Sequence, residues 1–235
     1  QHLSDTKFFS VLGEPRVDVL SAPDPLSARH EARTLLETAV PGVGEARAVL
    51  YAPTWRDGDP DPATPGPADW GSILSVLEAH DAVLLVRSHP LGGGDYAPPA
   101  PTSRVRMLGS DIVPDVTPLL AAMDVLVTDY SSLAYDAGLV PLPTLFLAPD
   151  VESYARTRGF YGTYADVAGA DVARSWPALC SQLGDVLGHE PEADRRRSRA
   201  AELSRRVHAW RDGGNARRVH DAIVAAVPEA AGEQS

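Results

Sequence analysis

The chain has 235 residues, of which 44% are hydrophobic and 23% charged, a composition typical of a globular protein with a core of its own. Its 21 basic and 32 acidic side chains give a net charge of −11, which argues against a surface that binds nucleic acid or anionic lipid broadly but allows a local basic pocket. The single cysteine, Cys180, excludes an internal disulfide and a multi-cysteine zinc site.

The start of the chain indicates a piece of a longer protein. The first residues, Gln1-His2-Leu3, include neither an initiator methionine nor a signal-peptide pattern. We therefore expect an excised domain. Residues 1–24 carry turn signals and no clear periodicity, and are predicted to form a short strand and a linker. No apolar run in the sequence reaches the ~18 residues needed to cross a bilayer.

Helices and short buried strands alternate along the middle of the chain. Helical patterns cover residues 27–39, 70–80, 116–123 and 131–139. Short apolar runs typical of buried parallel strands cover 46–52, 82–87, 104–108, 124–128 and 143–148. This alternation predicts βαβ units, and hence an α/β fold with a parallel sheet and helices on both faces. Beyond residue 150, residues 154–164 show no clear element, 174–188 and 190–210 are predicted to be helices, and 215–227 closes the chain.

Polar residues follow the strands, where ligands bind in open α/β sheets. Thr54 and Arg56 follow the first strand, and an arginine suits bidentate contact to phosphate, although a surface arginine is the simpler interpretation. Arg87 and His89 follow the second strand two residues apart, so both side chains point the same way in an extended segment. This pair fits a phosphate, or else His89 caps a neighbouring backbone group.

The fourth strand leads through Thr128-Asp129-Tyr130-Ser131-Ser132 directly into a predicted helix. Asp129 or Ser131 is a candidate N-cap, and the first turn of the helix with the hydroxyls of Ser131 and Ser132 favours an anion. Asp136 lies about one turn further along. It is predicted either to accept hydrogen bonds from ribose hydroxyls or to hold a loop in place.

Two further features each allow two interpretations. Asp150, Tyr154, Arg158 and Phe160 follow the fifth strand, and these aromatics either stack on a base or pack structurally. Between residues 190 and 220 the sequence contains nine arginines and five acidic residues. These residues form either a solvated helix face with i,i+4 ion pairs or a basic wall near a phosphate. The sequence contains no zinc-type cluster, nucleophile elbow or Walker loop, so neither a metal nor a cofactor is predicted.

Several segments, in this order, resemble the CDP-glycerol glycerophosphotransferase family of teichoic acid polymerases and primases. They are GEPRVDVL (13–20), VLYAPTWRD (49–57), LLVRSHP (84–90), residues 123–161 with TDYSS and RGFY, and DGGNARR (212–218). The resemblance implies the C-terminal half of a GT-B architecture, in which two Rossmann-like domains face each other. Residues 1–24 would then be the junction to a missing N-terminal domain, 25–228 the Rossmann-like nucleotide-donor-binding domain, and 229–235 a frayed tail.

The implied reaction transfers glycerol phosphate, or ribitol phosphate, from a CDP-activated donor to a growing teichoic-acid or capsule-like polymer and releases CMP. Arg87 and His89 would bind the pyrophosphate and stabilise charge, and the cytosine would lie against residues 109–115. The general base is expected outside this chain, so the isolated chain is expected to fold but to be inactive. The residues assigned to donor binding are Thr54, Arg56, Arg87, His89, Thr128, Asp129, Ser131, Ser132 and Asp136.

The implied partners are CDP-glycerol or a related CDP-polyol, and a polyol-phosphate or glycan acceptor that binds through the missing domain, with no nucleic acid. The implied location is cytoplasmic, with membrane contact only through the full-length protein. The sequence departs from the family at two places. It has Tyr135 where the family usually has Phe, and residues 167–170 replace a Pro-Gly-Pro-like segment. These departures leave the identity of the transferred group open. The alternatives are a nucleotide-sugar GT-B glycosyltransferase and a non-catalytic scaffold in cell-wall assembly.

Overall fold

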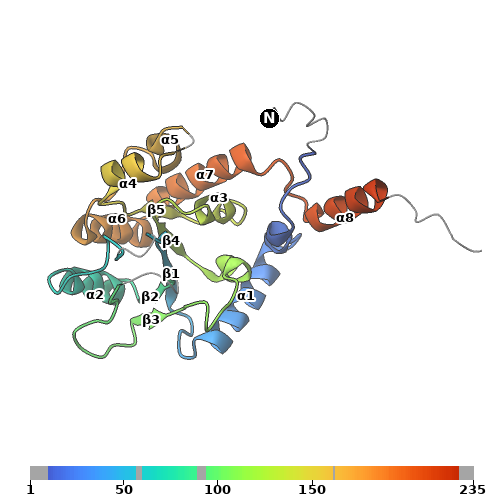
Figure 1. Cartoon of the computed structure of the whole chain (residues 1–235). Coiled ribbons are helices and arrows are strands. Elements are labelled where there is room, and N and C mark those ends of the chain that lie inside the picture. The colour runs from blue at the N-terminus through green and yellow to red at the C-terminus, as the bar shows by residue number, and fades with distance from the viewer. Residues whose placement is uncertain (1–9, 57–59, 89–93, 161, 228–235) are drawn as a thin grey trace, which may run out of the picture.

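Five parallel strands form one sheet at the centre of the molecule (Figure 1). The structure is a computed structural model that describes residues 10–56, 60–88, 94–160 and 162–227. The strands are β1 (Arg47–Ala52), β2 (Ala82–Val86), β3 (Val105–Met107), β4 (Val125–Thr128) and β5 (Thr144–Phe146). Their order is β3-β2-β1-β4-β5, with every pairing parallel. The chain therefore changes direction across the sheet between β1 and β4, the switch point at which open α/β sheets bind ligands.

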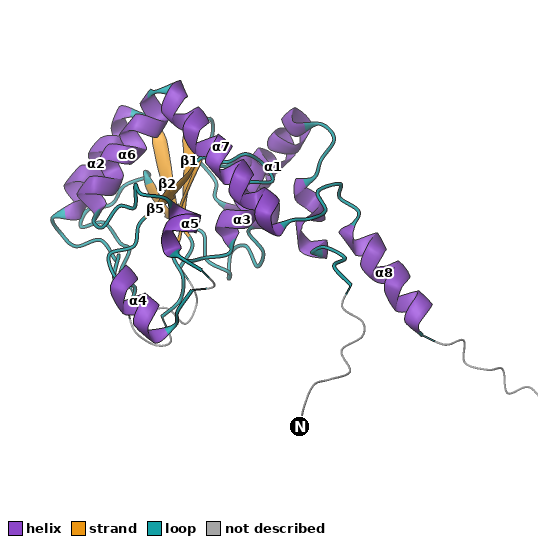
Figure 2. Cartoon of the chain, turned by 90° about the horizontal axis from the view of Figure 1, so that it is seen from above, coloured by secondary structure: helices purple, strands orange, loops and turns teal. Residues whose placement is uncertain are grey.

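Helices cover both faces of the sheet, as predicted (Figure 2). On one face, α2 (Asp69–Ala79) and α6 (Trp176–Gly188) pack against one set of alternate strand residues, among them Val49. On the other face, α1 (Pro25–Ala39) and the 3-10 helix η2 (Thr117–Ala122) pack against the other set, among them Leu50. All residues of β2 and β4 are buried. This double coverage explains why the strands are continuous apolar runs in the sequence.

A long helix packs beside β5, the last strand of the sheet. The long α7 (Glu190–Val207) packs against the short α3 (Leu133–Ala137), α6 and β5. Residues 154–164 contain more regular structure than predicted, because α4 (Val151–Thr157) extends into this region and α5 (Tyr164–Ala168) begins at its end. Thr163 and Asp166 form a capping box at the start of α5, a local signal that the aromatic, glycine-rich composition obscures. The helix predicted over 131–139 is shorter than expected.

The N-terminal segment lies beside the last helix, away from the sheet (Figure 1). Where a short strand was predicted, the described residues form a 3-10 helix, η1 (Pro15–Leu20), with a proline at its start. Trp210 Nε1 donates a hydrogen bond to the carbonyl of Val11, and the last helix, α8 (Asn215–Ala226), packs against η1. None of the described helices is both long enough and apolar enough to cross a membrane. The predicted tail, residues 229–235, lies outside the described residues.

Candidate functional site

A pocket of about 420 Å³ opens at the carboxyl ends of β1, β2 and β4, and we call it the strand-end pocket. Its walls come from five places: η1, the ends of β1 and β2, the loop after β3, and the start of α3. The described residues that line it include two arginines and four serines but no carboxylate. A pocket of this composition offers guanidinium and hydroxyl donors and suits an anion. The polar lining residues are Arg16, Arg87, Ser88, Ser110, Ser131 and Ser132.

Arg87 connects the end of β2 to the loop after β3. Its Nη1 donates hydrogen bonds to the carbonyls of Leu108 (3.2 Å) and Val113 (2.7 Å), and its Nη2 donates to the carbonyl of Pro114 (3.0 Å). Burial lowers the pKa of Arg87 from its ordinary value, and Asp115 opposes that shift. Arg87 therefore fixes the loop 109–115, the predicted cytosine region, while its side chain forms part of the pocket wall. His89, its predicted partner, lies outside the described residues.

The start of α3 supplies two hydroxyls to the pocket. Ser131 Oγ accepts a hydrogen bond from the N–H of Leu133 (3.3 Å). Ser132 occupies the N-cap position of α3, makes no side-chain capping bond and is exposed. Both serines that the sequence singled out thus line the pocket, opposite the end of β2 that carries Arg87.

Asp129 holds together the ends of β1 and β4 beneath the pocket, and it is only 2% exposed. Its Oδ1 accepts hydrogen bonds from the N–H (2.8 Å) and the hydroxyl (2.6 Å) of Thr54. The hydroxyl of Thr128 donates to the carbonyl of Ala52 (2.7 Å), across the same two strands. These contacts bind Thr54, Thr128 and Asp129 to one another or to the backbone, and none of the three is among the described residues that line the pocket.

Arg56 extends the network around Asp129, and its side chain is only 10% exposed. Its Nη2 pairs with Asp129 Oδ2 (2.8 Å) and its Nε with Asp150 Oδ2 (3.0 Å). The guanidinium carbon lies 4.9 Å from the ring centroid of Tyr130 and 5.1 Å from that of Tyr154. The two rings stack on each other, with 3.8 Å between their centroids. Burial alone would lower the pKa of Arg56, but its bonds to Asp150 and Asp129 raise it overall. Of the two interpretations of the aromatic segment, these contacts match structural packing.

Asp136 is fully enclosed, with 1% of its side chain exposed. Its Oδ2 forms an ion pair with Arg16 Nη2 (2.8 Å), and its Oδ1 lies 3.1 Å from Nε2 of His208. Burial raises the pKa of Asp136, while Arg16 and His208 act in the opposite direction. Of the two predicted roles, these contacts match that of holding a loop.

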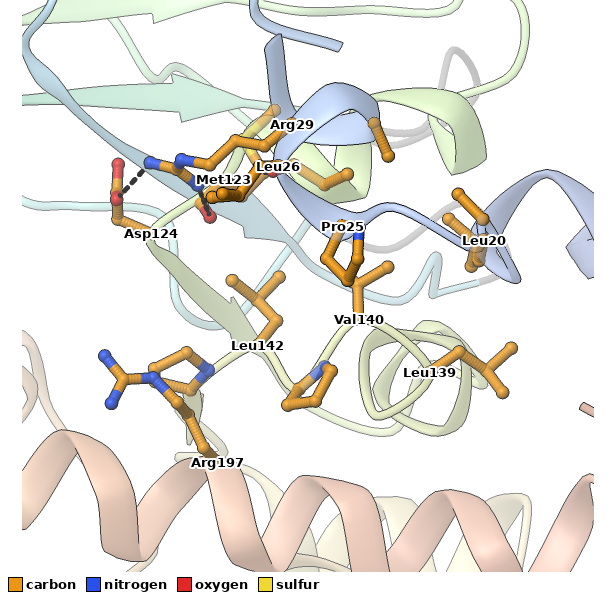
Figure 3. Close-up of a pocket in the computed structure, with 15 residues that line it drawn as sticks. Leu20, Pro25, Leu26, Arg29, Met123, Asp124, Leu139, Val140, Leu142 and Arg197 are labelled. Carbon is orange, nitrogen blue, oxygen red and sulfur yellow. Dashed lines mark hydrogen bonds and ion pairs between the residues drawn. The ribbon is translucent and has the colours of Figure 1, made fainter. Parts of the chain in front are cut away.

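A second pocket, of about 390 Å³, lies between α1 and the segment that leads into β5 (Figure 3). Leu20, Val140 and Leu142 point into it, and the charge of Arg29 at its edge is paired with that of Asp124 (2.7 Å). This apolar pocket lies at the amino ends of β4 and β5, the opposite end of the sheet from the strand-end pocket. Its second arginine, Arg197, is paired with Glu190 and Asp194, so both guanidinium groups of this pocket are already neutralised by carboxylates.

Comparison with known proteins decides the family. The model of the CDP-Glycerol:Poly(glycerophosphate) glycerophosphotransferase family matches residues 3–225. The chain belongs to this glycerophosphotransferase family.

The curated relatives of this glycerophosphotransferase-family chain are named as teichoic acid enzymes. It is 28% identical to the teichoic acid ribitol-phosphate primase of Bacillus spizizenii over 222 residues, which are 90% of this chain and 52% of that protein. It is also 28% identical to the teichoic acid glycerol-phosphate primase of the same organism, over 83% of this chain and 50% of that protein. The structure of the wall teichoic acid polymerase TagF matches with a TM-score of 0.70 and 24% identity, over 92% of this chain and 52% of that one.

The chain thus spans about half the length of these relatives. The likeness to TagF shows a shared fold, and the predicted fold class is confirmed. The predicted family is confirmed as well. Among the described residues of this glycerophosphotransferase-family chain, no group of three or more His, Cys, Asp or Glu side chains is arranged to hold a metal ion.

Sequence reasoning left one charge question open and did not single out four residues of the site, which are Arg16, Ser88, Ser110 and His208. Arg16 lines the pocket and His208 contacts Asp136, and for Arg16 the available signal was the GEPRVDVL segment. Several arginines of α7 pair with acidic side chains, such as the exposed Arg206 with Glu202 four residues away (2.8 Å). This helix therefore matches the solvated face with i,i+4 pairs, and it contributes no described residue to the strand-end pocket.

Proposed function

We propose that the strand-end pocket binds a CDP-activated polyol, and that the chain is the donor-binding domain of a glycerophosphotransferase. The complete enzyme would pass glycerol phosphate or ribitol phosphate to a teichoic-acid- or capsule-like polymer and release CMP. One observation carries this proposal: a pocket at the switch point of the sheet, lined by two arginines, four serines and no carboxylate among the described residues, in a chain of this family. Anionic diphosphate suits such a lining.

The diphosphate is proposed to lie between the end of β2 and the start of α3. Arg87 and the hydroxyls of Ser131 and Ser132 would contact phosphate oxygens from opposite sides. His89 remains a proposed member of this site on its sequence position alone. The cytosine is proposed to lie against the loop 109–115, because two hydrogen bonds from Arg87, to the carbonyls of Val113 and Pro114, hold that loop at the edge of the pocket.

An indirect role is proposed for the residues beneath the pocket. Thr54, Thr128 and Asp129 join the ends of β1 and β4, and Arg56 neutralises the buried charge of Asp129. This network keeps the two strand ends at a fixed spacing, so that groups on either side of the switch point reach one ligand. A preorganised site binds its ligand at a lower cost in free energy, because fewer groups must be ordered on binding.

In the proposed reaction, an oxygen of the acceptor hydroxyl forms a bond to the β-phosphorus of the donor. The bond from that phosphorus to the bridging oxygen breaks, and CMP leaves with the bonding electrons. Negative charge grows on the bridging oxygen, where Arg87 and the serine hydroxyls would stabilise it. The hydroxyl proton would pass to a general base that we expect outside this chain, so the isolated chain should bind the donor without turning it over.

Calorimetric titration of the purified chain tests the proposal. CDP-glycerol or CDP-ribitol should bind, UDP-glucose should not, and Ser131→Ala should weaken binding of the CDP-polyol by about tenfold if its hydroxyl contacts a phosphate. Ser198→Ala, an exposed serine on α7, is the matched control and should leave the affinity unchanged. Preference for UDP-glucose would favour a glycosyltransferase. Binding of no nucleotide at all would favour a scaffold.

A further inference from the structure

Arg16 reaches the strand-end pocket from the N-terminal segment that precedes the first helix and strand of the domain. It lies in η1, its side chain is 47% exposed, and it lines the pocket together with Arg87 and Ser131. Its Nη2 pairs with Asp136, and its Nε donates a hydrogen bond to the carboxylate of Glu14 (3.1 Å). Among the described residues, its Nη1 has no hydrogen-bond or ion-pair partner. Arg16 thus presents a partly free guanidinium to a pocket whose described walls contain no carboxylate.

The buried carboxylate of Asp136 ties Arg16 to the helix that carries the pocket serines. Asp136 lies on α3, one turn after Ser132, and its ion pair with Arg16 spans 2.8 Å. Asp136 is in turn fixed from the other side by His208, which follows the end of α7. The position of the Arg16 guanidinium relative to the serine hydroxyls is therefore set by a contact, and not only by the course of the backbone.

A clasp made by the C-terminal part of the chain holds the segment that carries Arg16. We define the clasp as residues 212–218. The carboxylate of Asp18 accepts hydrogen bonds from the backbone N–H groups of Asn215 (3.0 Å) and Ala216 (2.8 Å), and Asn215 Nδ2 donates to the carbonyl of Glu14 (3.2 Å). Gly13 has a φ of +88°, and a Cβ there would lie 2.0 Å from Asn215 Oδ1, so only glycine fits.

These contacts explain two segments of the sequence to which the proposed site had given no role. GEPRVDVL supplies the glycine, the arginine and the aspartate of this arrangement, and DGGNARR supplies the asparagine that holds them. The two segments are separated by nearly the whole chain, and Arg218 Nε completes the clasp by donating to the carbonyl of Leu12 (3.1 Å).

We propose that Arg16 binds the diphosphate of the donor, and that Asn215 and Asp136 are positioning residues that hold it over the strand-end pocket. This inference rests on the proposed function, because it assumes that a CDP-activated donor occupies this pocket. A guanidinium can pair with Asp136 on one edge and bind a phosphate oxygen through its remaining N–H groups, a division that a single ammonium group cannot reproduce. The donor site would therefore depend on a clasp that touches no ligand.

Calorimetry with CDP-glycerol, and an NMR titration with cytidine, which lacks phosphate, test this inference. Arg16→Gln is expected to weaken CDP-glycerol binding by about tenfold or more while leaving cytidine binding unchanged. Asn215→Ala is expected to weaken CDP-glycerol binding by about threefold or more, again without changing the affinity for cytidine. A general loss of structure would instead weaken the binding of both ligands. Arg104→Gln removes an ion pair with Asp81 away from the pocket and serves as the matched control.

Arg16→Lys covers the case in which glutamine beside the buried Asp136 prevents folding. Lysine keeps a positive charge next to that carboxylate, so this variant should fold. Its affinity for CDP-glycerol should nevertheless be about threefold or more lower than that of the wild type. If the wild type binds CDP-glycerol and the folded Arg16 variants bind it equally well, the inference is wrong and the proposed function stands. If the wild type binds no CDP compound, the proposed function fails and this inference fails with it.

Discussion

Arg56→Leu tests whether Arg56 is a structural counter-ion or a residue reserved for the ligand. The guanidinium lies between the carboxylates of Asp129 and Asp150, whose side chains are 3% and 18% exposed. Leucine would fill much of the same space but would leave two acidic groups facing each other without a cation. The other bonds of Asp129, from Thr54, and of Asp150, from Tyr130, would remain.

The magnitude follows from the burial of the two carboxylates. Removal of one partner from a buried ion pair costs about 3–5 kcal/mol. Because Asp150 is partly exposed to water and both carboxylates keep other hydrogen bonds, we expect a loss at the lower end, about 3 kcal/mol at pH 7. This is a large share of the roughly 5–15 kcal/mol by which a domain is stable, but it leaves the chain folded at room temperature.

Urea unfolding at pH 7 measures the effect. Arg206→Leu, which breaks an exposed pair with Glu202 on α7, is the control and should cost less than about 0.5 kcal/mol. A loss as small as the control's would refute the structural role.

Two further predictions concern the packing of α7. Gly138→Ala would place a methyl group 2.0 Å from the carbonyl oxygen of Ala200 and should lower the free energy of unfolding by about 3 kcal/mol. The control is Gly71→Ala in α2, where an added Cβ meets nothing within 4 Å, and it should raise the free energy of unfolding by about 0.5–1 kcal/mol. Equal melting temperatures of the two variants would contradict this prediction. The hydrogen bond from Arg195 lowers the pKa of Glu192 to about 2, so its stabilising effect is present near neutral pH and lost as the pH falls from about 4.5 to about 2. Glu192→Gln should accordingly show a shallower fall in urea midpoint than the wild type between pH 6 and pH 3, and parallel curves would be evidence against it.

The sheet could be predicted from the sequence because its signal is local. Each strand, such as Ala82–Val86, is a short apolar run between turns, and parallel strands covered on both faces need no polar alternation. The helix Val151–Thr157 could not be predicted, because its one aromatic residue, Tyr154, belongs to a tertiary cluster around Arg56. The composition of that segment reflects the cluster more than the helix.

The candidate site was predictable to the extent that it follows the strand ends. Ser131 and Arg87 line one pocket because the carboxyl ends of parallel strands meet at one edge of the sheet. The pairing of Arg56 with Asp129 joins residues that are far apart in sequence, and no local pattern reveals it. Arg16 was missed for a similar reason, since it is brought to the pocket by contacts that are distant in sequence, with Asp136 and between the two ends of the chain.

A crystal structure of the chain with CDP-glycerol would test the central claim most directly. We predict that the diphosphate lies in the strand-end pocket, within hydrogen-bond distance of the hydroxyl of Ser131 or Ser132 and of the guanidinium of Arg87 or Arg16. A donor bound elsewhere, for example in the apolar pocket beside Leu142 at the opposite end of the sheet, would contradict the account.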